Sequence, residues 1–111
     1  MKTQVIINTE VIGFHNYPNA PEKVLFLRNK HRHIFTIKAG FEVQILDREK
    51  EIYILQNDIE DYLYKVYGNP CNFNEMSCEM IAKEVIEFCE PDNCKWVEVL
   101  EDNKGGARVE L

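Results

Sequence analysis

The sequence predicts an α+β fold that combines an antiparallel sheet with two helices. Apolar and polar side chains alternate in two segments near the amino terminus and in two near the carboxyl terminus, which is the pattern of strands with one buried face. Between these pairs lie two segments whose apolar side chains recur every three or four residues, the pattern of amphipathic helices. The expected order is therefore β-β-α-α-β-β, within a single domain spanning residues 1–111.

Two long strands open the chain, the first expected over residues 3–14 and the second over residues 31–45. Their inward-facing side chains, all at odd positions, are Val5, Ile7, Val11, Phe35, Ile37, Phe41 and Val43. Residues 16–30 contain two prolines and predict a long ordered loop with a short helical or extended piece, and such loops are often functional. A polar turn at 47–50 lets the apolar run 52–55 extend the two strands into an antiparallel meander.

Two helices are expected to follow. Asn57 and Glu60 have the spacing of a capping box, which predicts a first helix over residues 58–67. Ser77 is a suitable amino-terminal cap for a second helix over residues 78–90. Both segments carry apolar side chains at helical spacing, so both helices are expected to cover the sheet with one face.

A hairpin is expected to close the chain. Residues 95–101 alternate again, with Val97, Val99 and Glu101 on one face, and residues 107–111 return beside them after a turn that contains glycine. The parity shared with two valines favours an inward position for the Glu101 carboxylate. The alternative is a solvated residue at the end of a strand.

Composition and charge exclude several classes of function. The formal net charge is -6 and the basic residues are scattered among acidic ones, so nucleic acid is not an expected partner. No apolar run reaches the length of about 18 residues that a membrane span needs, so no membrane partner is expected and the protein is predicted to be cytoplasmic. The cysteines, Cys71, Cys78, Cys89 and Cys94, have neither zinc-knuckle nor redox-pair spacing, which predicts reduced and mostly buried thiols, with paired disulfides as the alternative.

All three histidines of the chain are expected to meet at one end of the first two strands. His31 and His33 lie two residues apart on a strand and therefore point to the same face. His15 has the parity of the inward-facing residues of the first strand, and it lies beside the second strand if the loop returns antiparallel. Three histidines with an open fourth position are typical of a catalytic zinc. The alternative is a polar strand end at His31 and His33 with His15 as a capping or loop residue.

The order of these histidines resembles a known family. Phe14-His15, followed after a loop by His31-Arg32-His33, is similar to the first histidine and the HGH motif of the T-fold enzymes 6-pyruvoyl tetrahydropterin synthase and 6-carboxytetrahydropterin synthase. The resemblance covers nearly the whole chain and implies a T-fold-like architecture, a four-stranded antiparallel sheet with two helices packed on one face. It also implies a zinc ion held by His15, His31 and His33.

Two further motifs are similar to those with which this family holds its pterin. Ser77-Cys78, at the start of the second predicted helix, is similar to the family's Thr-Ser-Glu segment. Glu101, ahead of residues 105–107, is similar to the glutamate that anchors the pterin ring, where a carboxylate accepts two parallel hydrogen bonds from the edge that pterins and guanines share. Arg28 in the long loop is a candidate to neutralise a carboxylate or phosphate, the alternative being a solvated residue that orders the loop. The implied ligand is a pterin- or purine-like small molecule.

The sequence departs from the family at its catalytic groups. No cysteine lies between His15 and His31, where family members that cleave the pterin side chain carry a nucleophile-like cysteine, and residues 68–76 lack the histidine of the family's Asp-His pair. The catalytic residues are therefore unknown. Three functions stay open: a divergent zinc-dependent lyase or synthase acting on pterins or deazapurines, a non-catalytic protein that senses or sequesters a nucleotide-like molecule, and a structural subunit that uses its metal for rigidity.

The resemblance also implies assembly, because T-fold subunits join their sheets edge to edge and place their pockets between subunits. A homo-trimer or homo-hexamer is expected. The exposed edges of so small a sheet favour the same conclusion, since an unpaired strand edge is a site of association.

Overall fold

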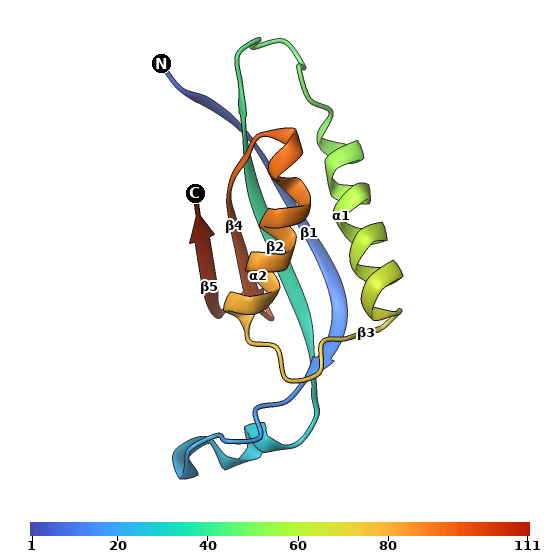
Figure 1. The fold of residues 1–111 in the computed structure, drawn as a ribbon, viewed down its shortest axis with the longest axis vertical. Helices are drawn as coiled ribbons and strands as arrows, with labels where there is room; N and C mark the ends of the chain where they lie inside the picture. The colour runs from blue at the N-terminus through green and yellow to red at the C-terminus, as the bar shows by residue number, and fades with distance from the viewer.

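The computed structural model describes residues 1–111 and has an α+β fold, with one five-stranded sheet and two α-helices (Figure 1). The elements in chain order are β1 (Thr3–His15), the 3-10 helix η1 (Glu22–Arg28), β2 (His31–Val43), α1 (Ile52–Tyr67), β3 (Cys71–Asn72), α2 (Cys78–Cys89), the 3-10 helix η2 (Glu90–Asp92), β4 (Cys94–Glu101) and β5 (Gly105–Glu110). The α+β class predicted from the sequence is confirmed. None of the helices has both the length and the apolar character that crossing a membrane requires.

The sheet has the strand order β3-β1-β2-β4-β5 and is mixed. The four long strands pair antiparallel, as expected, but β3 adds a fifth strand that runs parallel to β1 through Gly13 and Phe14. The expectation of four antiparallel strands was therefore wrong. The reason is that the link between the two α-helices crosses the end of β1, where Phe73 N donates to Phe14 O at 2.9 Å. A strand of two residues is too short to produce an alternating pattern.

Helix α1 begins earlier than the sequence predicted. It starts at Ile52, and its cap is Glu51, whose carboxylate accepts a hydrogen bond from Tyr53 N at 3.2 Å, so Asn57 lies inside the helix. The run 52–55 is thus the first turn of the helix and not a third strand of a meander. The buried residues of α1 are Leu55, Ile59 and Leu63, at a spacing of four. Residues 52–54 are exposed, so only Leu55 of this apolar run packs against the sheet.

Helix α2 agrees with the prediction to within one residue, since it ends at Cys89. Ser77 caps it, with its hydroxyl accepting from Met80 N at 3.2 Å. This hydrogen bond satisfies one of the free backbone N–H groups at the start of α2.

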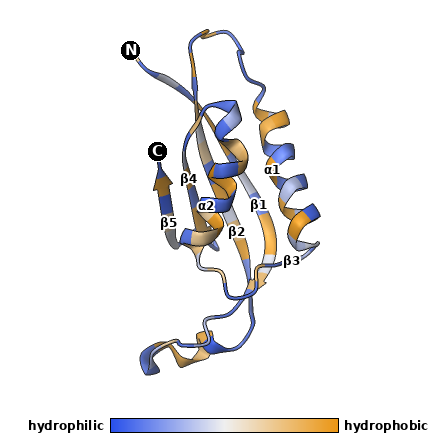
Figure 2. Ribbon diagram, viewed as in Figure 1, coloured by the Kyte–Doolittle hydropathy of each residue, from blue (hydrophilic) through white to orange (hydrophobic).

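The core lies between the sheet and the two α-helices, which both pack on its inward face. It contains 20 buried residues, drawn mostly from β1, β2, β4 and both α-helices, with Cys71 of β3 and Phe73 of the link that follows it. Hydrophobic and hydrophilic residues alternate along both helices in Figure 2, as expected of helices with one buried face. All four cysteines are buried and unpaired, in agreement with the expectation of reduced thiols.

Residues 16–30 project from one end of the sheet as an arm (Figure 1). The arm is held together by Tyr17 N, which donates to Leu27 O at 2.8 Å, and by Arg28 Nε, which donates to Ala20 O at 2.8 Å. Both ends of the arm enter the paired hairpin of β1 and β2, where His15 lies opposite His31. The expected ordered loop with a short helical piece is therefore present, with η1 as the helical piece.

Candidate metal centre

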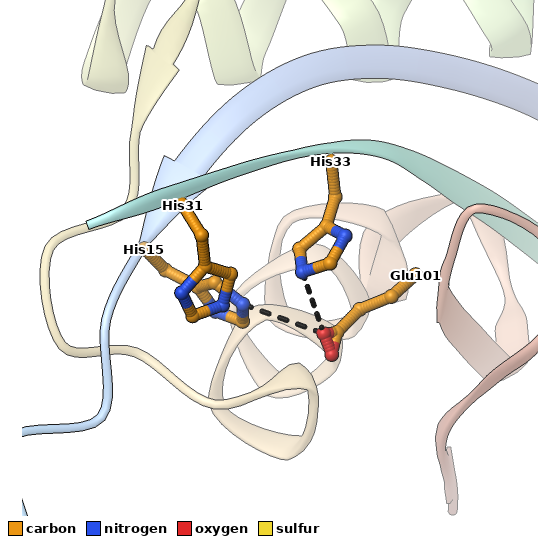
Figure 3. Close-up of side chains that lie close together, drawn as sticks. All are labelled: His15, His31, His33 and Glu101. Atoms are coloured by element: carbon orange, nitrogen blue, oxygen red, sulfur yellow. Dashed lines mark ion pairs between the residues drawn. The ribbon is translucent and has the colours of Figure 1, made fainter. Parts of the chain in front are cut away.

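The three histidine rings converge at the end of the sheet from which the arm projects (Figure 3). The pairing of β1 with β2 places His15 opposite His31, and His33 follows two residues along on the same face. The centroid of the His15 ring lies 4.6 Å from that of His31 and 5.3 Å from that of His33. The centroids of the His31 and His33 rings are 4.9 Å apart. The three histidines occupy odd positions, as do the core residues of β1 and β2, so their side chains lie on the same face of the sheet as the core.

Each ring is oriented by an acceptor at its Nδ1 atom. His15 Nδ1 lies 2.9 Å from Met76 O, and His31 Nδ1 lies 2.9 Å from Asn29 O. His33 Nδ1 lies 2.8 Å from a carboxylate oxygen of Asp102. Because a carbonyl or carboxylate oxygen only accepts, each Nδ1 carries the proton and donates, and a neutral ring then keeps its free lone pair on Nε2.

The three Nε2 atoms are buried and have no hydrogen-bond donor to accept from. His15 is itself only 8% exposed. Buried lone pairs without a partner carry a free-energy cost, and three of them turned toward a common space are the arrangement that a metal ion relieves.

Glu101 completes the cluster. Its Oε2 atom lies 3.1 Å from His33 Nε2 and 3.4 Å from His15 Nε2 (Figure 3). A neutral Nε2 and a carboxylate oxygen are both acceptors, so this approach is favourable only with a cation or a proton between the two atoms. One ligand atom from each of the four residues lies within 4.8 Å of the others, so His15, His31, His33 and Glu101 can hold a metal ion. Glu101 reaches this position because β4 pairs with β2 so that Glu101 lies opposite Phe35, two residues beyond His33.

An apolar floor supports the rings. The Phe35 ring meets His15 and His33 edge to face, with centroid distances of 5.2 and 5.6 Å, and it packs in turn on Phe73 at 5.0 Å. Phe35 and Phe73 are both fully buried. This floor excludes water from beneath the cluster and lowers the local dielectric constant, which strengthens interactions with a bound cation.

Asp102 is a member of the site that the sequence analysis missed. Its Oδ2 atom accepts from His33 Nδ1, its Oδ1 atom accepts from Ile34 N at 2.9 Å, and its own backbone N donates to Ile34 O at 2.8 Å. The hydrogen bonds from His33 and Ile34 hold the pKa of the Asp102 carboxyl below its ordinary value. The signal in the sequence was its place directly after Glu101, at the start of the predicted turn. In the structure its φ is 52°, a left-handed conformation that aspartate tolerates.

A cavity of about 530 Å³ opens beside the cluster. Its wall is formed by His15, His31 and Glu101, by residues of the arm and of the start of α2, and by Gly105 and Gly106 of β5. A heterocycle the size of a nucleobase fits such a volume. The histidine cluster therefore lies in the wall of a space large enough for a small molecule.

No protein-family model matches this chain, and a search of the curated proteins finds no match.

The remaining predicted ligand-binding residues lie in different places. Ser77 and Cys78 line the cavity, but the Ser77 hydroxyl already caps α2. Burial raises the pKa of the Cys78 thiol to about 12, helped by the nearby carboxylates of Glu101 and Glu79, so this thiol is protonated at neutral pH. Arg28 does not line the cavity, because its guanidinium is bound to Ala20 O within the arm.

The arrangement supports Lewis-acid chemistry in its simplest form. A bound divalent ion would polarise an oxygen of a molecule in the cavity or acidify a bound water. The protein's own contribution is a dry and oriented set of nitrogen ligands, with the Glu101 carboxylate near enough to accept a proton or to serve as a further ligand.

Proposed function

We propose that this protein is a divergent T-fold protein, related to 6-pyruvoyl tetrahydropterin synthase, that binds zinc through His15, His31 and His33 and a pterin- or purine-like molecule in the adjacent cavity. The observation that carries the proposal is the set of three buried Nε2 atoms that lack partners while every Nδ1 is fixed by an acceptor. Hydrogen bonding at the second ring nitrogen is a regular feature of metal-bound histidines.

Zinc suits the donor set better than other common ions. Three imidazoles and one carboxylate favour zinc over magnesium or calcium, which prefer oxygen ligands. In a tetrahedral zinc site with ligand distances near 2.0–2.1 Å, neighbouring ligand atoms lie about 3.3 Å apart. The separations from Glu101 Oε2 to His33 Nε2 and His15 Nε2, 3.1 and 3.4 Å, are close to this value.

The T-fold and its assembly are part of the proposal. The four long antiparallel strands and the two helices on one face are consistent with that fold, with β3 as an addition. Strand β5 is paired with β4 on one side only, which leaves its outer edge open to a strand of another copy. We propose a homo-trimer or homo-hexamer, and light scattering on the purified protein measures its mass. The buried free thiols also suit the reducing environment of the cytoplasm.

Binding without catalysis is the form of the proposal that we favour. The one cysteine in the cavity wall, Cys78, has a protonated thiol, and all three histidines are occupied as metal ligands in this scheme. A zinc-dependent lyase or synthase is the second candidate. It is favoured by the position of the cavity beside the cluster, where an oxygen of the bound molecule can reach the metal.

Metal analysis of two matched variants tests the zinc site. The purified protein is expected to contain about one zinc ion per chain, and His31→Ala is expected to lose it. Arg32→Ala is the control, because Arg32 lies next to His31 on the same strand but on the opposite, exposed face. Unchanged zinc content in His31→Ala would remove the proposal.

Two measurements distinguish the binding protein from the enzyme. Mass spectrometry of small molecules released on denaturation is expected to show a retained, unmodified heterocycle if the protein sequesters its ligand. Conversion of dihydroneopterin triphosphate by the zinc-loaded protein would instead establish the enzyme.

A further inference from the structure

We infer that Glu101 is a displaceable fourth ligand of the metal, so that the protein closes its own metal site until a molecule in the cavity replaces the Glu101 carboxylate. The inference rests on the proposed function, because it concerns the same metal. It differs from the role that the resemblance implies for Glu101, since the carboxylate is turned toward the histidines (Figure 3). It does not depend on how copies of the protein assemble, because β1, β2 and β4 of one chain supply all four side chains of the cluster.

A single oxygen atom of Glu101 faces two nitrogen lone pairs. Glu101 Oε2 lies 3.1 Å from His33 Nε2 and 3.4 Å from His15 Nε2, and all three atoms are acceptors when the rings are neutral. One proton can join Oε2 to only one of the two nitrogen atoms, and the other close approach then stays unfavourable. A divalent cation between the three atoms attracts all of them at once. The carboxylate therefore has the position of a metal ligand.

The Glu101 carboxylate is the least supported of the four ligands. Each histidine ring donates from Nδ1 to an oxygen atom that fixes its orientation. The close polar contacts of the Glu101 carboxylate are with Nε2 of His15 and of His33, and neither nitrogen is a donor when its ring is neutral. Carboxylates that bind metal ions are usually held by hydrogen bonds of their own. Because Glu101 lacks such bonds, it is the ligand that a competing molecule displaces most readily.

Only the side chain of Glu101 needs to move for this displacement. Its backbone is fixed at the end of β4, where it pairs with Phe35 on one side and with Gly105 on the other. The Glu101 side chain is 30% exposed and lines the cavity, whereas that of His15 is 10% exposed and packs against the Phe35 ring. Rotation of the Glu101 side chain into the cavity therefore opens one coordination position while the three histidines stay in place.

The position of Glu101 determines which of two kinds of metal site the protein has. Four protein ligands, with Glu101 bound, are typical of a structural zinc. Three histidines with an open position, after Glu101 has left, are typical of a catalytic zinc. A molecule that enters the open position must bring an oxygen or nitrogen donor of its own to replace the carboxylate. The site is thus expected to be closed to water while the cavity is empty.

Azide binding to the full-length, cobalt-loaded protein tests the inference. Cobalt(II) replaces zinc in such sites and its visible absorption reports a change of ligand, so a titration with azide measures access to the fourth position. Azide binds only the open form, and its apparent affinity is therefore reduced by the fraction of protein in that form. With Glu101 closing about 90% of the sites or more, Glu101→Ala is expected to bind azide about ten-fold more tightly than the wild type, or tighter still. Glu101→Gln, which carries a poorer ligand of the same size, is expected to shift the affinity in the same direction.

Glu79→Ala is the matched control, because Glu79 lies in the wall of the same cavity but outside the cluster. It removes one negative charge without removing a ligand, so its azide affinity is expected to equal that of the wild type. Equal affinities in the wild type and both Glu101 variants, or the same gain in Glu79→Ala as in Glu101→Ala, would overturn the inference. Metal content is measured first on each sample. A wild type that takes up neither zinc nor cobalt refutes the proposed function, whereas a fully loaded protein whose azide affinity does not depend on Glu101 refutes the inference alone.

Discussion

Asp102 Oδ2 and His33 Nδ1 lie 2.8 Å apart, joining the turn after β4 to the histidine at the start of β2. The second oxygen of the same carboxylate accepts from Ile34 N, the residue after His33. Asp102 therefore fixes both the proton and the orientation of the His33 ring, and it leaves Nε2 turned toward Glu101. Carboxylates in this position raise the basicity of a metal-bound histidine and are costly to remove.

Asp102→Asn should weaken zinc binding about 10–100-fold without unfolding the protein. Asparagine tolerates the positive φ at this position and can still accept from Ile34 N. It loses the charged acceptor that holds the His33 proton. Competition with a chromophoric chelator measures the affinity, and thermal unfolding of the metal-free protein provides the control. An affinity equal to that of the wild type would show that Asp102 does not position His33.

Ser77→Ala should destabilise the protein by about 1 kcal/mol, because Ser77 is the cap of α2. Ser77→Thr should keep most of the stability, since threonine also caps helices. Urea unfolding of the metal-free variants measures both effects. Full stability in Ser77→Ala, together with weaker ligand binding, would assign the hydroxyl to the ligand and not to the helix.

Gly106→Ala should destabilise the hairpin of β4 and β5 by about 1–3 kcal/mol. A Cβ atom at this position would clash with Val99 O, which belongs to the backbone of the neighbouring strand and cannot rotate away. Gly105→Ala is a close control, because its Cβ would meet no atom within 4 Å. Its change should stay within about 0.5 kcal/mol. Denaturant titrations compare the two, and equal losses would contradict the explanation.

Stability should decrease as the pH rises from about 9 to about 11, in part because of Cys71. Burial raises the pKa of this thiol from 9.0 to about 11, so the unfolded chain releases its proton at a lower pH than the folded one. The contribution to stability is complete below pH 9 and is lost as the pH passes the folded value. Cys71→Ala should show a smaller loss of unfolding free energy between pH 8 and pH 10.5 than the wild type. Identical losses would exclude the thiol as a source.

Strand parity explains why the histidine cluster was predictable. His31 and His33 share odd positions with Phe35 and Ile37, so the burial of the core fixes the direction of the rings. The antiparallel pairing of β1 with β2 then brings His15 beside His31, and this pairing does not depend on the conformation of the arm between them. Predicting the cluster therefore required only the alternation of apolar and polar residues and one antiparallel strand pair, and the sequence indicates both.

The parts that were missed depend on contacts between distant segments. Met76 O and Asn29 O accept hydrogen bonds from the rings of His15 and His31. Because every residue has a backbone carbonyl, the sequence does not indicate which carbonyls take this role. Strand β3 exists only because the link between the helices happens to cross the end of β1. The start of α1 was misplaced because an apolar run of four residues has no clear period. The cap is the carboxylate of Glu51, six residues before the predicted cap Asn57.

The arm leaves the sheet at His15 and returns at His31, two residues that are held opposite each other by strand pairing. The strand pairing at the base of the arm sets the distance between the two rings, so this distance does not depend on the length of the arm. Insertions or deletions in the outer part of the arm should therefore be tolerated without disturbing the histidine cluster. Because Tyr17 and Leu27 of the arm also form part of the cavity wall, such changes would alter which molecules are admitted. The geometry of the histidine cluster and the lining of the cavity can thus change independently of each other.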